Sequence, residues 1–196
     1  RRRTVQARAL ANAAGPWAVA FLDTVASVPH EHALRLVKGS HIVVPKLFDH
    51  DHAYIFQQPD RRIVFVIPFE DRFSLIGTTD VDFHDDPSHV RMDAAQRDYL
   101  CAAVNRSFRQ QIGADDVLWS FSGVRPLLDD AHAAASAVTR DYQLDLDVEG
   151  APLLNVLGGK LTTFRRLAEE AVDLLVHDAG SNAPAWTAEG PVLPGG

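Results

Sequence analysis

A strand that runs into glycine and then into a helix occurs near each end of the chain, and this pair of junctions constrains the fold most. At the start, the apolar segment Val5–Ala11 leads to Gly15 and then to a helical pattern. Near the other end, the strand Leu153–Leu157 leads to Gly158 and Gly159, which open a second helix. Junctions of this kind are typical of nucleotide-binding α/β sheets.

The region between the two junctions has the pattern of an antiparallel sheet with one long helix. Apolar runs bounded by turn residues predict strands over Leu34–Pro45, Ala53–Gln57, Ile63–Phe69, Phe73–Thr78, Val117–Arg125 and Val138–Asp145. A helix is predicted over about Ala94–Gln111, with Asp93 as N-cap and Gln96 as its capping-box partner. Gly39 marks a bulge or a close approach within its strand. The order predicts an α/β protein, in which an α+β domain with a mixed, largely antiparallel sheet is inserted between two pieces of an α/β domain.

Composition excludes several classes of protein. The longest apolar run, Ile63–Phe69, is far shorter than the roughly 20 residues of a membrane span. The single cysteine, Cys101, excludes an internal disulfide. There are 26 acidic against 19 basic residues, and no basic stripe with interleaved aromatic residues. We therefore expect no nucleic-acid partner.

The second glycine junction is the first candidate site. Its helix start, with Lys160, Thr162 and Thr163, favours an anion, because free N–H groups and the positive end of the helix dipole meet there. Leu161 stands where a P-loop needs Ser or Thr, so that pattern fails. The alternative is a glycine turn with ordinary helix capping.

Two side chains in the central region suit chemistry with a charged substrate. Arg125, just before Pro126 at the predicted end of a strand, suits bidentate capture of a phosphate or carboxylate, or else it forms a surface ion pair. His41, in an apolar strand, is either a satisfied core residue or a general base. The segment Gly77–Asp80 either lines a pocket or forms a turn closed by its own hydroxyl and carboxylate groups.

Paired histidines are the candidates for metal ligands. They occur at His30/His32 and at His50/His52, in polar stretches with no cysteine nearby. The acidic stretch from Asp80 to Asp86 lacks the glycine and the glutamate of a calcium loop. We expect no metal site.

Several short segments, in order along nearly the whole chain, resemble one family, the FAD-dependent glycerol-3-phosphate dehydrogenases. The segments are Asn12–Trp17, Lys38–Pro45, Ile76–Asp80, Ser122–Pro126, Thr139–Tyr142, Gly158–Arg165 and Ala185–Thr187. No G-x-G-x-x-G fingerprint occurs, and the only methionine is Met92. We therefore expect an internal fragment of a longer enzyme, inactive alone, that lacks the family's N-terminal flavin-binding segment and its C-terminal domain.

The resemblance implies FAD as cofactor and a four-part division of the chain. Residues 1–28 and 151–180 would belong to a Rossmann-like FAD-binding domain, residues 29–150 to a substrate-binding domain, and residues 181–196 to a linker. The residues implied to contact FAD are Ala14, Gly15, Gly158, Gly159, Lys160, Leu161 and Thr162.

The implied reaction is oxidation of sn-glycerol 3-phosphate to dihydroxyacetone phosphate, with hydride transfer to FAD and electrons passed on to a quinone. In this scheme Arg125 clamps the phosphate, and Lys160 stabilises negative charge beside flavin and substrate. His41 takes the proton of the C2 hydroxyl, a role that Arg125 can share. Thr163 is a further substrate contact.

Several alternatives stay open on the sequence. They are a glycerol-3-phosphate oxidase that uses oxygen, an amine or amino-acid oxidase of similar architecture, and a non-catalytic module that binds a phosphorylated ligand. The expected location is cytoplasmic, either free or peripheral on the cytoplasmic face of the inner membrane. A homodimer is one assembly left open.

Overall fold

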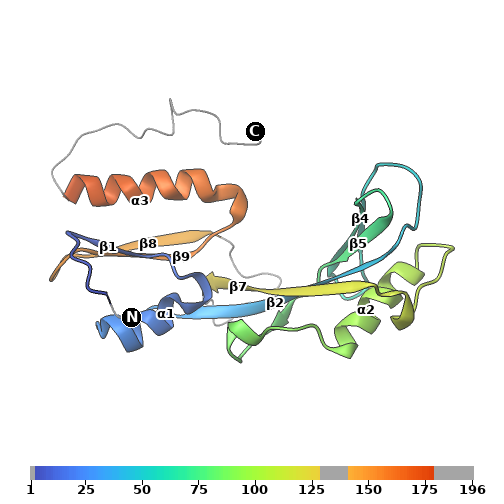
Figure 1. Ribbon diagram of the computed structural model, residues 1–196, viewed down its shortest axis with the longest axis horizontal. Coiled ribbons are helices and arrows are strands. Elements are labelled where there is room, and N and C mark those ends of the chain that lie inside the picture. Colours follow the sequence, from blue (N-terminus) through green and yellow to red (C-terminus); the bar gives the residue numbers. More distant parts are fainter. Residues whose placement is uncertain (1–2, 129–140, 179–196) are drawn as a thin grey trace. The chain divides into compact units, whose positions relative to one another are not determined.

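The computed structural model describes residues 3–128 and 141–178, which form two compact units (Figure 1). One unit comprises residues 3–34, 126–128 and 141–178, and the other comprises Arg35–Arg125. The first two residues of the expected segment Thr139–Tyr142, the start of the predicted strand Val138–Asp145, the segment Ala185–Thr187 and the linker 181–196 lie outside the described residues. Because the units divide near residues 34 and 125, they do not coincide with the expected boundaries at 28 and 150.

The first unit is built on a three-stranded sheet of order β1-β9-β8. β1 (Leu10–Asn12) is parallel to β9 (Leu153–Gly158), and β8 (Tyr142–Asp147) is antiparallel to β9. Figure 1 shows α3 (Phe164–Asp178) on one side of this sheet and α1 (Ala18–Phe21) on the other. Leu153, Leu154 and Leu157 are buried, as expected for a strand covered on both faces.

The first predicted strand is much shorter than Val5–Ala11. Only Leu10–Asn12 pairs, against Leu153–Asn155 of β9, and Val5 is 84% exposed. Apolar composition alone does not make a strand, because each backbone N–H and C=O needs a partner. The helical pattern that follows consists of a 3₁₀ turn η1 (Gly15–Trp17), α1 and a π-turn η2 (Leu22–Ala26).

The second unit is built on a six-stranded sheet. Its order is β3-β4-β5-β2-β6, and β7 also pairs with β2. The strands are β2 (Leu34–Pro45), β3 (Tyr54–Gln57), β4 (Ile63–Phe69), β5 (Phe73–Gly77), β6 (Val81–Asp82) and β7 (Trp119–Leu128). The pairs β2–β5, β2–β6, β3–β4 and β4–β5 are all antiparallel, as predicted.

The core of the second unit lies between this sheet and α2 (Ala94–Asn105). Alternate residues of β4 (Val64 and Val66) pack with Ile76 against Leu100 and Val104 of the helix. On the other face of the sheet, the remaining β4 residues are partly exposed. This period-2 pattern is what fixes the register, because a shift of one residue would turn the buried set outward.

Helix α2 begins as predicted and ends six residues earlier than predicted. Asp93 accepts from the Gln96 amide at 2.8 Å, and Gln96 Oε1 accepts from the Asp93 amide at 3.4 Å, which is the predicted capping box. At the other end, the side chain of Asn105 bonds both the N–H and the C=O of Ile112, each at 2.8 Å. These bonds turn the chain back and replace further helical turns.

Short connecting elements complete the described chain. They are the 3₁₀ helices η3 (Pro87–His89), η4 (Ala114–Asp116) and η5 (Leu161–Thr163), the last of which leads directly into α3. Within residues 3–128 and 141–178, no helix is long and apolar enough to cross a membrane.

Candidate active site

Arg125 lies within β7, three residues before the strand ends, and not at its tip as predicted. Its guanidinium donates through Nη1 to Asp80 Oδ1 at 2.8 Å and through Nη2 to Thr78 Oγ1 at 3.1 Å. The Arg125 side chain is 32% exposed and that of Asp80 is 14% exposed. A charged fork is therefore held in one orientation and still reaches solvent.

Two glycines make room for the two predicted functional side chains. A Cβ on Gly39 would lie 2.5 Å from Nη2 of Arg125, and a Cβ on Gly77 would overlap the imidazole ring of His41. His41 and Gly77 are also register partners between β2 and β5. The close approach that the sequence predicts at Gly39 is confirmed, and its cause is the Arg125 guanidinium.

His41 is half-buried and its ring stacks on Phe121 of β7, with centroids 4.9 Å apart and an interplanar angle of 5°. Its Nδ1 is buried and has no hydrogen-bond partner among the residues described. Burial, together with the positive charge of Arg125, lowers the pKa of His41 below its ordinary 6.5. At neutral pH the imidazole is therefore uncharged and able to accept a proton.

A buried polar network supports the strands that carry these groups. Thr79 Oγ1 accepts from the Ser40 amide at 3.0 Å and from Gln96 Nε2 at 2.8 Å. The Ser40 hydroxyl bonds Gln96 Oε1 at 3.3 Å and the Ser122 hydroxyl at 2.8 Å. The network ties β2, the end of β5, β7 and α2 together beside Arg125 and His41. The sequence predicted Gln96 as a helix cap and Gly77–Asp80 as a turn or pocket lining, but it gave no sign that these groups meet Ser40 and Ser122.

In the first unit, the turn that contains Ala14 and Gly15 is held by a buried asparagine. Asn12 Nδ2 donates to Ala18 O and to Asn155 Oδ1, both at 3.0 Å. Gly15 has φ +56°, and a Cβ there would meet nothing within 4 Å in the described part of the chain. The turn is thus rigid on its inner side and open beside Gly15. Asn12 begins one of the segments that resemble the family, but its structural role was not predicted.

The second junction is shaped by backbone conformation. Gly158 and Gly159 have φ +74° and +95°, a region that side chains disfavour. Thr163 Oγ1 accepts from the Lys160 amide at 3.3 Å, which caps the helix start. The Thr163 amide donates to Lys160 O at 3.0 Å, so the amides without an intrahelical acceptor are those of Leu161 and Thr162. Leu161 is 87% exposed. The predicted helix start after the two glycines is therefore present and accessible.

The predicted site residues are divided between the two units. His41 and Arg125 lie together in the second unit. The remaining predicted residues belong to the first unit, namely Ala14, Gly15, Gly158, Gly159, Lys160, Leu161, Thr162 and Thr163.

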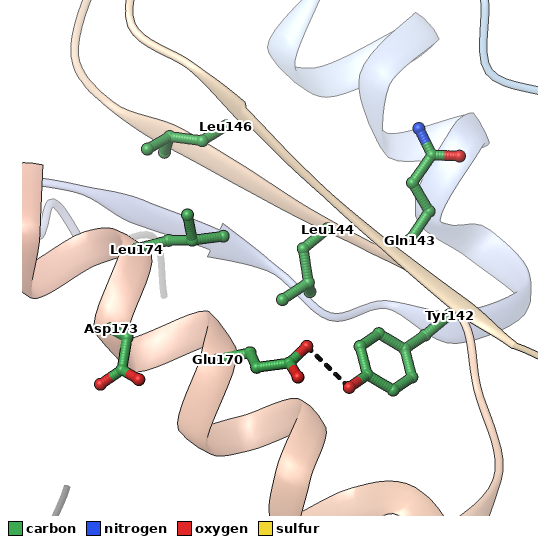
Figure 2. Close-up of a pocket in the computed structure, with 7 residues that line it drawn as sticks. All are labelled: Tyr142, Gln143, Leu144, Leu146, Glu170, Asp173 and Leu174. Atoms are coloured by element: carbon green, nitrogen blue, oxygen red, sulfur yellow. Dashed lines mark hydrogen bonds between the residues drawn. The ribbon is translucent and has the colours of Figure 1, made fainter.

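A pocket of about 790 Å³ lies between β8 and α3 in the first unit (Figure 2). Figure 2 shows Leu144 and Leu146 of β8 and Leu174 of α3 among the lining residues, and the hydroxyl of Tyr142, which donates to Glu170 at 2.7 Å. None of the predicted site residues lines this pocket.

The paired histidines do not form a metal centre in the residues that the structure describes, where no group of three or more potential ligands is found. His30 and His32 stack at 5.8 Å, and each bonds one carboxylate, Asp23 and Asp145 respectively. His50 bonds the Tyr54 hydroxyl at 2.8 Å. Each of these three histidines thus has a neighbour that accounts for its position.

The parallel strand pair and the glycine-shaped helix start are typical of a nucleotide-binding α/β protein, and the comparison with known proteins gives the class more narrowly. The model of the FAD-dependent oxidoreductase family matches residues 1–165. The chain belongs to the FAD-dependent oxidoreductase family.

Two relatives and one solved structure show which members of the family the chain is similar to. The chain is 50% identical over 193 residues to the aerobic glycerol-3-phosphate dehydrogenase of Escherichia coli, covering 97% of this chain and 38% of that protein. It is 49% identical over 195 residues to a D-erythritol 1-phosphate dehydrogenase of Brucella abortus, covering 99% of this chain and 39% of that protein. A solved glycerol-3-phosphate dehydrogenase from Bacillus halodurans, complexed with FAD, superposes with a TM-score of 0.78 at 33% identity, covering 95% of this chain and 35% of that one. The chain therefore spans less than two fifths of these relatives.

Proposed function

We propose that this chain is part of an enzyme that oxidises sn-glycerol 3-phosphate to dihydroxyacetone phosphate. The observation that carries the proposal is the pairing of an anchored guanidinium with a neutral, half-buried imidazole, Arg125 with His41, in one sheet. The 50% identity to a glycerol-3-phosphate dehydrogenase over nearly the whole chain supports this choice of substrate.

The residues of the first unit fit FAD. The open space beside Gly15 and the exposed helix start after Gly159 suit a ligand with anionic groups, because no side chain fills the space at Gly15 and the helix start presents backbone N–H donors. Ala14, Gly15 and Gly158–Thr162 would hold the cofactor. When bound, FAD supplies the hydride acceptor for the reaction.

The chain's own residues would bind and orient the substrate. Arg125 offers charge-assisted hydrogen bonds to the phosphate, because Asp80 and Thr78 engage two of its five N–H donors. His41, held neutral, accepts the proton of the C2 hydroxyl. Lys160 and the helix start of the first unit stabilise negative charge, and Thr163 is a further substrate contact.

The domain assignment follows from the same proposal. Residues 1–28 and 151–180 form part of an FAD-binding domain, residues 29–150 contain a substrate-binding domain whose compact body is Arg35–Arg125, and residues 181–196 form a linker. The parallel pair β1–β9 supports the first assignment, since parallel strands joined by a crossover are typical of nucleotide-binding sheets.

We further propose a quinone as electron acceptor, a cytoplasmic location at the inner membrane face where quinones are found, and a homodimer. The names of the relatives as dehydrogenases favour an acceptor other than oxygen. Steady-state turnover with a soluble quinone against oxygen uptake separates this proposal from an oxidase.

A test of the substrate site is Arg125→Ala in the full-length enzyme that this proposal implies. We expect kcat/KM for glycerol 3-phosphate to fall by roughly 10- to 150-fold, since a hydrogen bond to a charged group contributes about 1.5–3 kcal/mol. The control is Arg35→Ala, because Arg35 bonds Asp82 in the same sheet away from His41. Equal kinetics for both variants would remove Arg125 from the site.

A second substrate is favoured by the 49% identity to a D-erythritol 1-phosphate dehydrogenase. Both substrates carry a phosphate and an oxidisable hydroxyl, so the same Arg125 and His41 serve either one. Comparing kcat/KM for glycerol 3-phosphate and D-erythritol 1-phosphate in the same preparation decides between them, and the larger value identifies the substrate.

A further inference from the structure

Asp80 is an enclosed carboxylate beside the proposed site, and its partner is the Arg125 guanidinium. One alternative from the sequence was that the Asp80 side chain bonds within its own turn. Instead, its Oδ1 accepts from Arg125 Nη1 at 2.8 Å, across 45 residues of chain. With only 14% of its side chain exposed, this carboxylate is directed inward.

Three contacts fix the guanidinium from different sides. Asp80 holds Nη1 and Thr78 Oγ1 holds Nη2 at 3.1 Å. The backbone of Gly39 lies against the whole group, because the three atoms nearest to a Cβ at that position would all be guanidinium atoms. A free arginine side chain loses rotamer entropy when it binds a ligand, and an anchored one has already lost it. The anchored fork therefore binds an anion with a smaller entropic cost.

We propose that Asp80 is a positioning residue, which orients the Arg125 guanidinium toward the substrate phosphate. Thr78 holds the second guanidinium nitrogen, and Gly39, which has no Cβ, leaves room for the group. This rests on the proposed function. Asp80 does not touch the substrate in this scheme. Its negative charge by itself opposes a phosphate dianion, so its benefit comes through geometry alone.

The Asp80 charge disfavours phosphate binding, whereas its hydrogen bond to Arg125 favours it, so two variants can separate the two effects. In the full-length enzyme, Asp80→Asn removes the charge but keeps an oxygen that accepts from Nη1, whereas Asp80→Ala removes both. We expect KM for glycerol 3-phosphate to rise about tenfold or more in Asp80→Ala and far less in Asp80→Asn. We expect kcat to change less than KM in both.

The matched control is Asp82→Asn, two residues along the same segment. Asp82 bonds Arg35 at 2.6 Å and lies on the exposed side of the pairing between β2 and β6. Its loss should leave KM unchanged. FAD content and the thermal midpoint, measured for every variant, identify any variant that fails to fold. If Asp80→Ala fails in this way, the Asp80→Asn and rescue measurements decide the matter.

Chemical rescue gives a readout that a merely structural role would not move. Added guanidinium ion should restore part of the activity of Arg125→Ala, because Asp80 and Thr78 remain to bind it. In Arg125→Ala/Asp80→Asn the rescue should need a clearly higher guanidinium concentration, because a free guanidinium ion, unlike the tethered Arg125 side chain, relies on the Asp80 charge to stay bound. Equal rescue in both backgrounds, or a lower KM in Asp80→Ala than in the parent enzyme, would overturn the role of Asp80. Unchanged kcat/KM in Arg125→Ala would instead overturn the proposed function, and the role of Asp80 with it.

Discussion

The two units position their functional groups by different means. In the second unit, Arg125 is fixed by side chains, Asp80 and Thr78, and by the missing Cβ of Gly39. In the first unit, the helix start at Lys160 is shaped by the backbone, through the positive φ angles of Gly158 and Gly159. A charged side chain must therefore be oriented by partners, whereas backbone N–H donors are oriented by the chain itself.

The two units also differ in how completely their long helices are buried. Leu100 and Val104 of α2 are fully buried against the six-stranded sheet. On α3, Phe164, Val172 and Leu174 are 51%, 49% and 39% exposed in the described residues. The second unit thus has a complete helix-on-sheet core, while the long helix of the first unit leaves much apolar surface uncovered.

The largest expected effect compares these two helices. Leu100→Ala should lower the free energy of unfolding by about 2–5 kcal/mol, because it leaves a cavity in a packed core. Leu174→Ala should cost under about 1 kcal/mol, because this side chain is 39% exposed. Urea unfolding of the chain, followed by circular dichroism, measures both. Similar costs would show that α3 is packed as tightly as α2.

The next effect concerns backbone shape at the helix start. Gly159→Ala should lower stability by about 1–3 kcal/mol, because φ is +95° and a Cβ would lie 3.1 Å from Leu167 Cδ1. Gly150→Ala is the control, since a Cβ there meets nothing within 4 Å among the described atoms. In the full-length enzyme, FAD retention should fall for the first variant only. Loss in neither variant would contradict a backbone-shaped site.

The smallest effect is a shift along the pH axis. Burial and the Arg125 charge lower the pKa of His41 below 6.5. The imidazole therefore stays unprotonated, and able to act as a base, down to a pH below 6.5. Replacing Arg125 by Gln removes the repulsive charge, and the acid limb of kcat/KM should move to higher pH. A phosphate monoester itself titrates near pH 6, so the difference between the two enzymes, which share one substrate, is the relevant quantity. A limb that does not move would exclude His41 as the base.

The same shift has a consequence for stability. A histidine with a lowered pKa in the folded state binds its proton more readily when the chain is unfolded. The free energy of unfolding should therefore fall as pH drops through 6.5 toward the folded pKa, and stay level above 6.5. In His41→Asn this part of the pH dependence should disappear, which thermal unfolding across the range can measure.

Elements with a long local pattern were predictable. The bounds of β2 and β4 agree with the predicted Leu34–Pro45 and Ile63–Phe69, because apolar runs bounded by turn residues specify paired strands. The start of α2 agrees because its capping box is a local bond. The predicted bounds of β1 and the predicted end of α2 were wrong, because β9 and Ile112 determine them from a distance.

The amino-acid sequence alone specifies the alternation of strands and helices, the two glycine junctions and the residues that suit an anionic substrate and FAD. Which of those residues meet is set by the tertiary structure. It joins Arg125 to Asp80 across 45 residues, stacks His41 on Phe121, and makes Gly39 and Gly77 the space for side chains from other strands. The physical reason is that hydrophobic periodicity and capping act within a few residues. An ion pair or a close approach depends instead on which strands become neighbours, and the pairing of β2 with β5 and β7 sets this.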